Sequence, residues 1–135
     1  MDERIAEGTV AEFAVGVFDL NDLKKVNDTQ GHNAGDRYIK EACMCICKCF
    51  QHSPVYRIGG DEFAVILEGE DYAAQDELLE VFDRQMEENL AQRKIVVSTG
   101  ISRFVPGQDN SFRTVFERAD EKMYQRKRTL KGISR

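Results

Sequence analysis

The chain has 135 residues, of which 32% are charged and 41% hydrophobic, a balance that predicts one domain with a buried core rather than a disordered polypeptide. Its formal net charge of −5 does not favour binding along a nucleic-acid backbone. No apolar run approaches the roughly 20 residues that cross a bilayer, and the N-terminus lacks the basic-then-apolar order of a signal peptide. These features predict a soluble, cytoplasmic protein.

The first half of the chain predicts one strand and two helices. Residues 1–9 are polar and form an entry segment, whereas residues 10–19 are rich in β-forming side chains and predict a central strand that ends at Asp19. A short helix follows over residues 21–28, which Asn21 or Asp22 can cap. Residues 31–36 predict a turn, and a second helix runs to about residue 50.

The second half predicts a β-hairpin, a helix, a strand and a last helix. The hairpin strands, residues 55–56 and 63–67, flank Gly59-Gly60-Asp61-Glu62. The next helix spans residues 72–90. A strand with one face partly exposed to solvent spans residues 94–104. The final amphipathic helix begins near residue 111 and ends in a basic tail. The apolar stripe of the 72–90 helix is predicted to contain Leu78, Val81 or Phe82, Met86 and Leu90.

This order of elements predicts an α/β (α+β) fold built on a split βαβ sheet of the ferredoxin-like type. In that topology the third strand lies beside the first and runs antiparallel to it. We therefore expect Asp19, at the end of the first strand, to lie across from Asp61, at the start of the third.

Two carboxylates brought together in this way repel each other unless a cation lies between them or one takes up a proton. Oxygen ligands of this kind suit Mg²⁺, which commonly bridges to substrate phosphates. Lys24 and the basic end of the last helix supply cations for phosphates, and the short helix after Asp19 offers free N–H groups to an anion. These parts indicate metal-dependent phosphoryl or nucleotidyl transfer. A lone Gly-Gly-Asp-Glu is equally typical of a solvated hairpin turn.

Four cysteines, Cys43, Cys45, Cys47 and Cys49, alternate within one predicted helix. Such spacing invites a metal-binding interpretation, but helical periodicity places Cys43 in the core, with Cys47 and Cys49 flanking the apolar stripe and Cys45 more exposed. No histidine pair or second cysteine cluster completes a tetrahedral site. Structural, reduced thiols are therefore favoured, and a zinc-binding domain remains the alternative.

The ordered motifs of the chain closely resemble the GGDEF domain of diguanylate cyclases. They are Asp19-Leu20-Asn21-Asp22-Leu23-Lys24, Asn27-Asp28, Gly31-His32, Gly35-Asp36, Gly59-Gly60-Asp61-Glu62-Phe63, Ser98-Thr99-Gly100-Ile101, and Ala119-Asp120 with Tyr124 and Lys127. The resemblance covers about residues 11–131. It divides the chain into an entry segment (1–9), a GGDEF domain (10–131) and a tail (132–135).

The resemblance implies a palm-type fold, similar to polymerase and nucleotide cyclase domains, that condenses two GTP molecules into cyclic di-GMP and pyrophosphate. Each subunit would hold one GTP, so catalysis would need a homodimer. Asp19, Asp61 and the backbone carbonyl of Leu20 would bind Mg²⁺, for which Mn²⁺ is an alternative. Glu62 would assist at the attacking ribose hydroxyl or at the metal.

The resemblance also implies a set of GTP-binding residues. Asn27 and Asp36 would read guanine, whose N–H groups are donors that a carboxylate can accept. Phosphate contacts and space for the nucleotide would come from Lys24, Lys127, Lys131, the main-chain N–H groups of Asp22 and Leu23, and Gly60. The alternatives are purely structural roles: Asp36 caps the second helix, and Asn27 is a turn residue. Arg57 is expected to support the hairpin through a carboxylate.

Four departures from the family pattern bear on activity. Many relatives have aspartate at the position of Asn21 and phenylalanine at that of Leu23, and neither change removes an expected metal ligand. The inhibitory Arg-x-x-Asp motif would fall on residues 50–53 and is absent. The family's opening helix is also missing, so the chain resembles a fragment that follows a sensory or dimerising domain, as in the cytoplasmic part of a membrane-anchored sensor.

A catalytically weak or inactive GTP-binding module is the alternative function; neither function involves nucleic acid or membrane contact.

Overall fold

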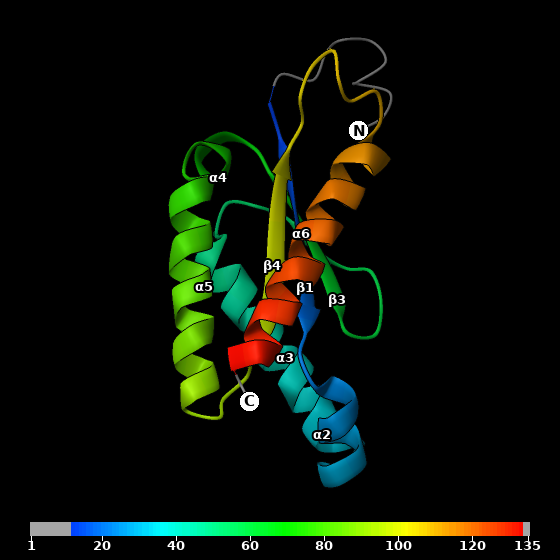
Figure 1. The fold of residues 1–135 in the computed structure, drawn as a ribbon, viewed down its shortest axis with the longest axis vertical. Helices are drawn as coiled ribbons and strands as arrows, with labels where there is room; N and C mark the ends of the chain where they lie inside the picture. The colour runs from blue at the N-terminus through cyan, green and yellow to red at the C-terminus, as the bar shows by residue number, and fades with distance from the viewer. Residues whose placement is uncertain (1–11, 134–135) are drawn as a thin grey trace.

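A computed structural model describes residues 12–133, which form a four-stranded sheet with helices on both faces (Figure 1). The strands are β1 (Ala14–Leu20), β2 (Val55–Arg57), β3 (Glu62–Leu67) and β4 (Val97–Arg103). Their order in the sheet is β2-β3-β1-β4, and every neighbouring pair is antiparallel. This is the order of the split βαβ arrangement, so the predicted fold class is confirmed. The predicted entry segment, residues 1–9, lies outside the described residues.

The helices are α2 (Leu23–Gln30), α3 (His32–Cys49), α4 (Gly69–Ala73), α5 (Gln75–Ala91) and α6 (Phe112–Ile133). Figure 1 shows α6 crossing in front of the sheet while α3 lies behind it. Within residues 12–133, no helix is long and apolar enough to cross a membrane.

The central strand β1 is buried on both faces. Its residues Ala14, Phe18 and Leu20 enter the core formed with α3 and α5, whereas Val15 and Val17 enter the core formed with α6. The alternation follows from the two-residue period of a strand. Residues 14–18 of β1 are therefore apolar side chains and one glycine, because neither face of the strand meets water.

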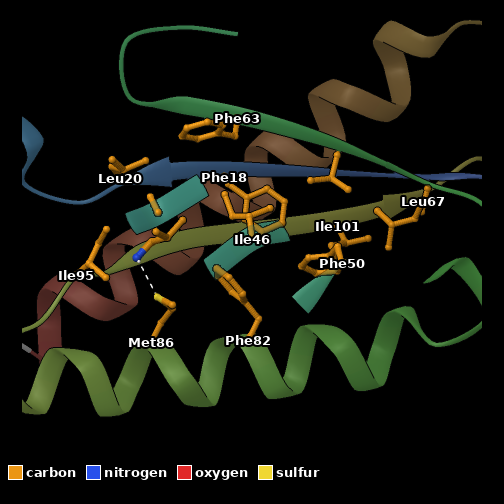
Figure 2. Packing of buried hydrophobic residues seen from close by; sticks show 14 of the residues in the cluster. Phe18, Leu20, Ile46, Phe50, Phe63, Leu67, Phe82, Met86, Ile95 and Ile101 are labelled. Atoms are coloured by element: carbon orange, nitrogen blue, oxygen red, sulfur yellow. Dashed lines mark hydrogen bonds between the residues drawn. The ribbon is translucent and has the colours of Figure 1, made fainter. Parts of the chain in front are cut away.

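Phe18 is the largest β1 side chain in the α3–α5 core, where Figure 2 shows it beside Phe50 and Phe82. Its ring meets both edge to face, with centroid distances of 5.5 Å to Phe50 and 5.4 Å to Phe82. Burying one such side chain stabilises a fold by about 1.5–3 kcal/mol, and each edge-to-face pair adds about 0.5–1.5 kcal/mol. This cluster fastens the strand that carries Asp19 to two helices.

The last strand was predicted to have one face partly exposed to solvent, and the structure shows that this is wrong. All residues of β4 are buried except Arg103, because α6 covers one face and α5 reaches the other. On the α5 side, the Val97 N–H donates to the Met86 sulfur at 3.2 Å, the contact dashed in Figure 2.

Several element boundaries also differ from expectation. The predicted 31–36 turn contracts to Gly31, whose positive φ of 87° reverses the chain so that α3 begins at His32. The 72–90 helix is divided into α4 and α5 at Ala74, and Phe82 rather than Val81 faces the core. Neither Asn21 nor Asp22 caps α2 through its side chain: Asp22 occupies the N-cap position without such a bond, and Asn21 accepts from Ser98.

The phase of α3 corrects the predicted exposure of the cysteines. Cys47 is the exposed thiol, whereas Cys45 and Cys49 pack against the core together with Ala42 and Ile46. Residues at positions 42, 45, 46 and 49 form a stripe at three-and-four spacing. Cys43, which was expected in the core, is half-buried at its margin.

Gly100 is where α6 approaches β4 most closely. A Cβ at this position would lie 2.3 Å from the Met123 nitrogen and 2.4 Å from the Ala119 carbonyl oxygen. Both are backbone atoms, so they can move aside only if the helix moves. Only glycine lets α6 lie this close to the sheet.

We therefore expect Gly100→Ala to lower the free energy of unfolding by about 3 kcal/mol, since overpacking against backbone displaces α6. Urea unfolding followed by circular dichroism measures the change. Gly132→Ala, also in α6, is the matched control because a Cβ there meets nothing within 4 Å; its stability should be unchanged or slightly raised. Equal stability of Gly100→Ala and the parent chain would contradict the close approach.

Asp83 of α5 faces Arg126 of α6 across the edge of the sheet. The Arg126 Nε lies 3.7 Å from the Asp83 Oδ1, too far for a hydrogen bond, and Arg126 Nη2 donates to the Asp83 carbonyl oxygen at 3.2 Å. Burial raises the pKa of Asp83 to about 6, with the guanidinium of Arg126 opposing the rise and Glu87 adding to it.

Because this folded-state pKa is raised, the folded protein keeps a proton that the unfolded chain loses at lower pH. The resulting stabilisation is complete below a pH of about 4 and is lost as the pH rises through about 6. We expect Asp83→Asn, which has no proton to lose, to gain about 2 kcal/mol relative to the parent chain between these limits. Urea unfolding over a pH series tests this, with the exposed Glu80→Gln as control; parallel pH curves for Asp83→Asn and the parent would refute it.

Candidate active site

The carboxylates of the candidate site come from the end of β1 and the start of β3. Asp19 is paired with Glu62 in the register of these strands, and the Leu20 N–H donates to the Asp61 carbonyl oxygen at 2.9 Å. The predicted meeting of the two strand ends is therefore correct. The partner directly across from Asp19 is Glu62 rather than Asp61, and β3 begins at Glu62, one residue before the predicted strand.

The turn between β2 and β3 is closed by backbone acceptors. Arg57 donates to the carbonyl oxygens of Gly59 at 3.1 Å and Gly60 at 2.9 Å, and the Ile58 N–H donates to the Glu62 carbonyl at 3.0 Å. The expected support of the hairpin by Arg57 is real, but its partners are carbonyls and not a carboxylate. A Cβ at Gly60 would meet nothing within 4 Å, so the outer side of the turn is open.

Lys127 brings α6 to the same place. Its Nζ lies 3.2 Å from Asp19 Oδ2, and both side chains are largely buried. The other oxygen, Asp19 Oδ1, is buried without a hydrogen-bond partner. A buried carboxylate oxygen left unpaired is costly, so this atom is a ready acceptor for a cation or donor.

Negative charge accumulates around these groups. Burial raises the pKa of Asp19, the Lys127 ammonium opposes that rise, and the charge of Asp61 adds to it. Burial also raises the pKa of Glu62, and the charges of Asp120, Asp19 and Asp61 raise it further. A cation placed among these carboxylates would relieve this repulsion.

Asp120 belongs to this acidic cluster and was not among the residues expected from the sequence to act in the site. It lies on α6 seven residues before Lys127, a spacing that puts both side chains on one face of a helix. The seven-residue spacing from Lys127 is therefore the sequence signal that indicates Asp120. Only the packing of α6 against β4 and β1 brings Asp120 near Glu62.

The carboxylates do not form a complete metal shell by themselves. Among residues 12–133, no group of three or more His, Cys, Asp or Glu side chains is arranged to hold a metal ion. Mg²⁺ typically takes one or two protein carboxylates and fills its remaining positions with water and substrate phosphates. Two carboxylates, Asp19 and Asp61, with one backbone carbonyl fit this coordination preference of Mg²⁺. The unpaired Asp19 Oδ1 supplies a ligand atom.

The two expected guanine-reading residues come from α2 and α3, where these helices meet. The Asn27 side chain lies against Gly35, so closely that a Cβ there would be 1.7 Å from Asn27 Oδ1. Asp36 follows Gly35 in α3 and is exposed. Gly31, not Asp36, is the N-cap of α3, so the capping alternative for Asp36 is wrong.

The other expected nucleotide contacts lie around α2 and the end of α6. Leu23 is buried and Lys24 exposed in the first turn of α2, after Asp22 in a left-handed conformation with φ of 63°. Asp22 and Lys131 line a cavity of about 760 Å³ between α2, α5 and α6. Lys127 contacts Asp19, so the structure brings it to the carboxylates.

A four-stranded antiparallel sheet flanked by helices, with carboxylates where β1 meets the β2–β3 turn, has the architecture of a palm-like nucleotide cyclase domain. The chain matches the family described as "Diguanylate cyclase, GGDEF domain" over residues 3–132 and belongs to that family. Both the expected family and the expected fold are thereby confirmed.

Curated relatives share this assignment. Diguanylate cyclase DgcS of Shewanella oneidensis is 32% identical over 112 residues, which cover 82% of this chain and 38% of that protein. Diguanylate cyclase A of Treponema denticola is 28% identical over 117 residues, covering 82% and 31%. The chain thus spans less than half the length of these relatives.

Solved structures show the same fold. The GGDEF domain of DgcB from Caulobacter crescentus, crystallised with c-di-GMP, superposes with a TM-score of 0.73 at 29% identity, covering 94% of this chain and 78% of that one. A longer DgcB structure, which includes a coiled coil, gives a TM-score of 0.74 and covers 95% of this chain and 70% of that one.

Proposed function

We propose that this chain is the catalytic domain of a diguanylate cyclase, which converts two GTP molecules into cyclic di-GMP and two pyrophosphates. The observation that carries the proposal is the buried, unpaired Asp19 Oδ1 beside Asp61 and Glu62. The family and the DgcB domain bound to c-di-GMP support it.

In this proposal Asp19, Asp61 and the Leu20 carbonyl would hold Mg²⁺, or Mn²⁺ in its place. When bound, the metal would stabilise the negative charge that develops on the transferred phosphate. The chain's own contribution is to hold the carboxylates together: the Leu20 N–H and Arg57 both anchor the backbone of the turn that bears Asp61.

Lys127 has two roles in the proposal. Without a cation, its ammonium neutralises Asp19 at 3.2 Å and so reduces the cost of burying that carboxylate. With a metal at the carboxylates, the ammonium is free to contact the triphosphate, alongside Lys24 and Lys131 and the main-chain N–H groups of Asp22 and Leu23. The α2 N-terminus suits an anion because no Asp22 side-chain bond caps it.

Glu62 is the proposed proton acceptor for the attacking 3′-hydroxyl, with metal binding as its other role. Burial and neighbouring carboxylates raise its pKa, and a carboxylate with a raised pKa is a stronger base. Gly60 leaves the outer side of the turn open for the nucleotide. Asn27 and Asp36 would accept the N1–H and N2–H₂ donors of guanine.

The reaction needs two copies of the domain, because each would bind one GTP and each hydroxyl would attack the α-phosphate of the other nucleotide. The domain would therefore act as a homodimer, held together by an N-terminal sensory or dimerising segment in a longer protein. A DgcB structure contains a coiled coil together with the GGDEF domain, and coiled coils join two or more helices.

The direct test is to incubate the concentrated chain with GTP and Mg²⁺ and resolve the products by chromatography, with and without a dimeric coiled coil fused to the N-terminus. We expect cyclic di-GMP and pyrophosphate, with more product from the fusion. Asp61→Asn should lower the rate by about 100-fold or more, since loss of a metal ligand removes about 3 kcal/mol or more of charge stabilisation.

Glu68→Gln, which follows β3 at the end away from the turn, is the matched control for loss of one carboxylate and should keep the parent rate. Saturable GTP binding without pyrophosphate release, even in the fusion, would contradict the proposal and leave a GTP-binding module. Equal product from Asp61→Asn and the parent would contradict the assignment of the site.

Gly35 offers a test of the guanine site that leaves the carboxylates intact. Gly35→Ala forces the Asn27 side chain away from its position. We expect weaker GTP binding by about 10-fold and reduced preference over ATP, because a guanine donor loses its acceptor. Isothermal titration calorimetry measures both affinities.

Asn27→Ala and the double variant complete this test as a double-mutant cycle. If Gly35 acts only through Asn27, the double variant should bind GTP no more weakly than either single variant. Fully additive losses, or unchanged discrimination against ATP in all three variants, would contradict guanine recognition by Asn27.

A further inference from the structure

Two of the four cysteines of α3 bring their sulfurs close together. Cys43, Cys45 and Cys49 are half-buried against the core, and the Cys49 thiol donates to the Leu78 carbonyl at 3.5 Å. Cys43 and Cys47 lie one helical turn apart with their sulfurs 3.9 Å from each other, and Cys47 is exposed. The Cys43–Cys47 pair can be reached from solvent through Cys47 and has no role in the nucleotide site described above.

A disulfide is a poor fit to Cys43 and Cys47. Residues four apart in a helix hold their Cβ atoms about 5–6 Å apart, whereas a disulfide requires about 3.5–4.5 Å. Closing the bond would therefore distort α3. A metal ion between the sulfurs adds two bonds of about 2.3 Å each, so it spans the pair without moving the helix.

We propose that Cys43 and Cys47 bind a soft monovalent cation, Cu(I), with Met44 as a third sulfur ligand. Two metal–sulfur bonds of about 2.3 Å joined to sulfurs 3.9 Å apart enclose an angle of about 120°, the angle of trigonal coordination. Met44 lies three residues before Cys47, a spacing that makes their side chains neighbours on the helix surface, and it is 70% exposed, so its thioether can be reached by an ion. Its thioether is a soft ligand of the type that selects Cu(I).

The ligand count distinguishes this site from a zinc site. Structural zinc takes four ligands in a tetrahedron, and within residues 12–133 no cluster of three or more His, Cys, Asp or Glu side chains can hold a metal. Cu(I) is stable with two or three sulfur ligands. Binding replaces two S–H protons with one Cu⁺, so two protons go to solvent and the complex carries one negative charge.

The surroundings of the pair favour a cation. Cys47 lies in the last turn of α3, where the helix dipole presents negative charge. Lys40, one turn before Cys43, is exposed and can balance the charge of the complex.

The test is anaerobic titration of the full chain with Cu(I), using bicinchoninate as a coloured competitor and a thiol-free reductant. We expect one Cu(I) per chain, an X-ray absorption spectrum with sulfur neighbours only, and affinity that rises with pH. Cys43→Ser and Cys47→Ser should each weaken binding by about 100-fold, and Met44→Leu by about 10-fold.

Cys45→Ser is the matched control, since its thiol lies on the same helix but outside the Cys43–Cys47 sulfur pair; it should bind Cu(I) as the parent does. Circular dichroism confirms that each variant remains folded. Equal affinity in the parent and the folded Cys43→Ser/Cys47→Ser double variant would overturn the site. Unchanged affinity in Met44→Leu would overturn the third ligand, and displacement of Cu(I) by equimolar zinc would overturn the choice of metal.

Discussion

The position of β1 between β3 and β4 is the constraint on which the rest of this structure depends. Because β1 pairs on both edges and is covered on both faces, its side chains must be apolar except near its end, where the Asp19 side chain is largely buried. The same pairing carries the β2–β3 turn to that end and aligns Glu62 with Asp19. The aromatic contacts of Phe18 fasten the strand to the helices behind it. The acidic site is therefore a product of the most buried part of the fold.

Placing carboxylates at the edge of such a core is unfavourable, and the structure offsets the cost only in part. Lys127 neutralises one oxygen of Asp19, but the other has no partner, and the pKa of Glu62 is raised by burial and by three neighbouring acids. A fold selected for stability alone would replace these groups with apolar ones. These carboxylates instead lie where a nucleotide cyclase fold holds its site. This is the physical reason for proposing that a cation and phosphates complete the site.

Much of the fold could be predicted because the signals were local. Strand alternation, the two-glycine turn and the apolar spacing of the last helix predicted the elements and their order. The errors arose where a neighbouring element decided the outcome. The strand at residues 97–103 was expected to expose one face to solvent, but α5 and α6 together cover both of its faces. The cysteine helix was expected to expose Cys45, but it packs with Ala42, Cys45, Ile46 and Cys49 against the core and leaves Cys47 exposed.

The sequence by itself determined the order of the elements, the family resemblance and the identity of most candidate site residues, because turn chemistry and hydrophobic periodicity are encoded within short windows. Only the tertiary structure decided the register of Asp19 with Glu62, the approach of Lys127 and Asp120 from α6, and the fit of Asn27 against Gly35. These are contacts between segments far apart in the chain. Their geometry depends on how helices and strands pack, which no local pattern specifies.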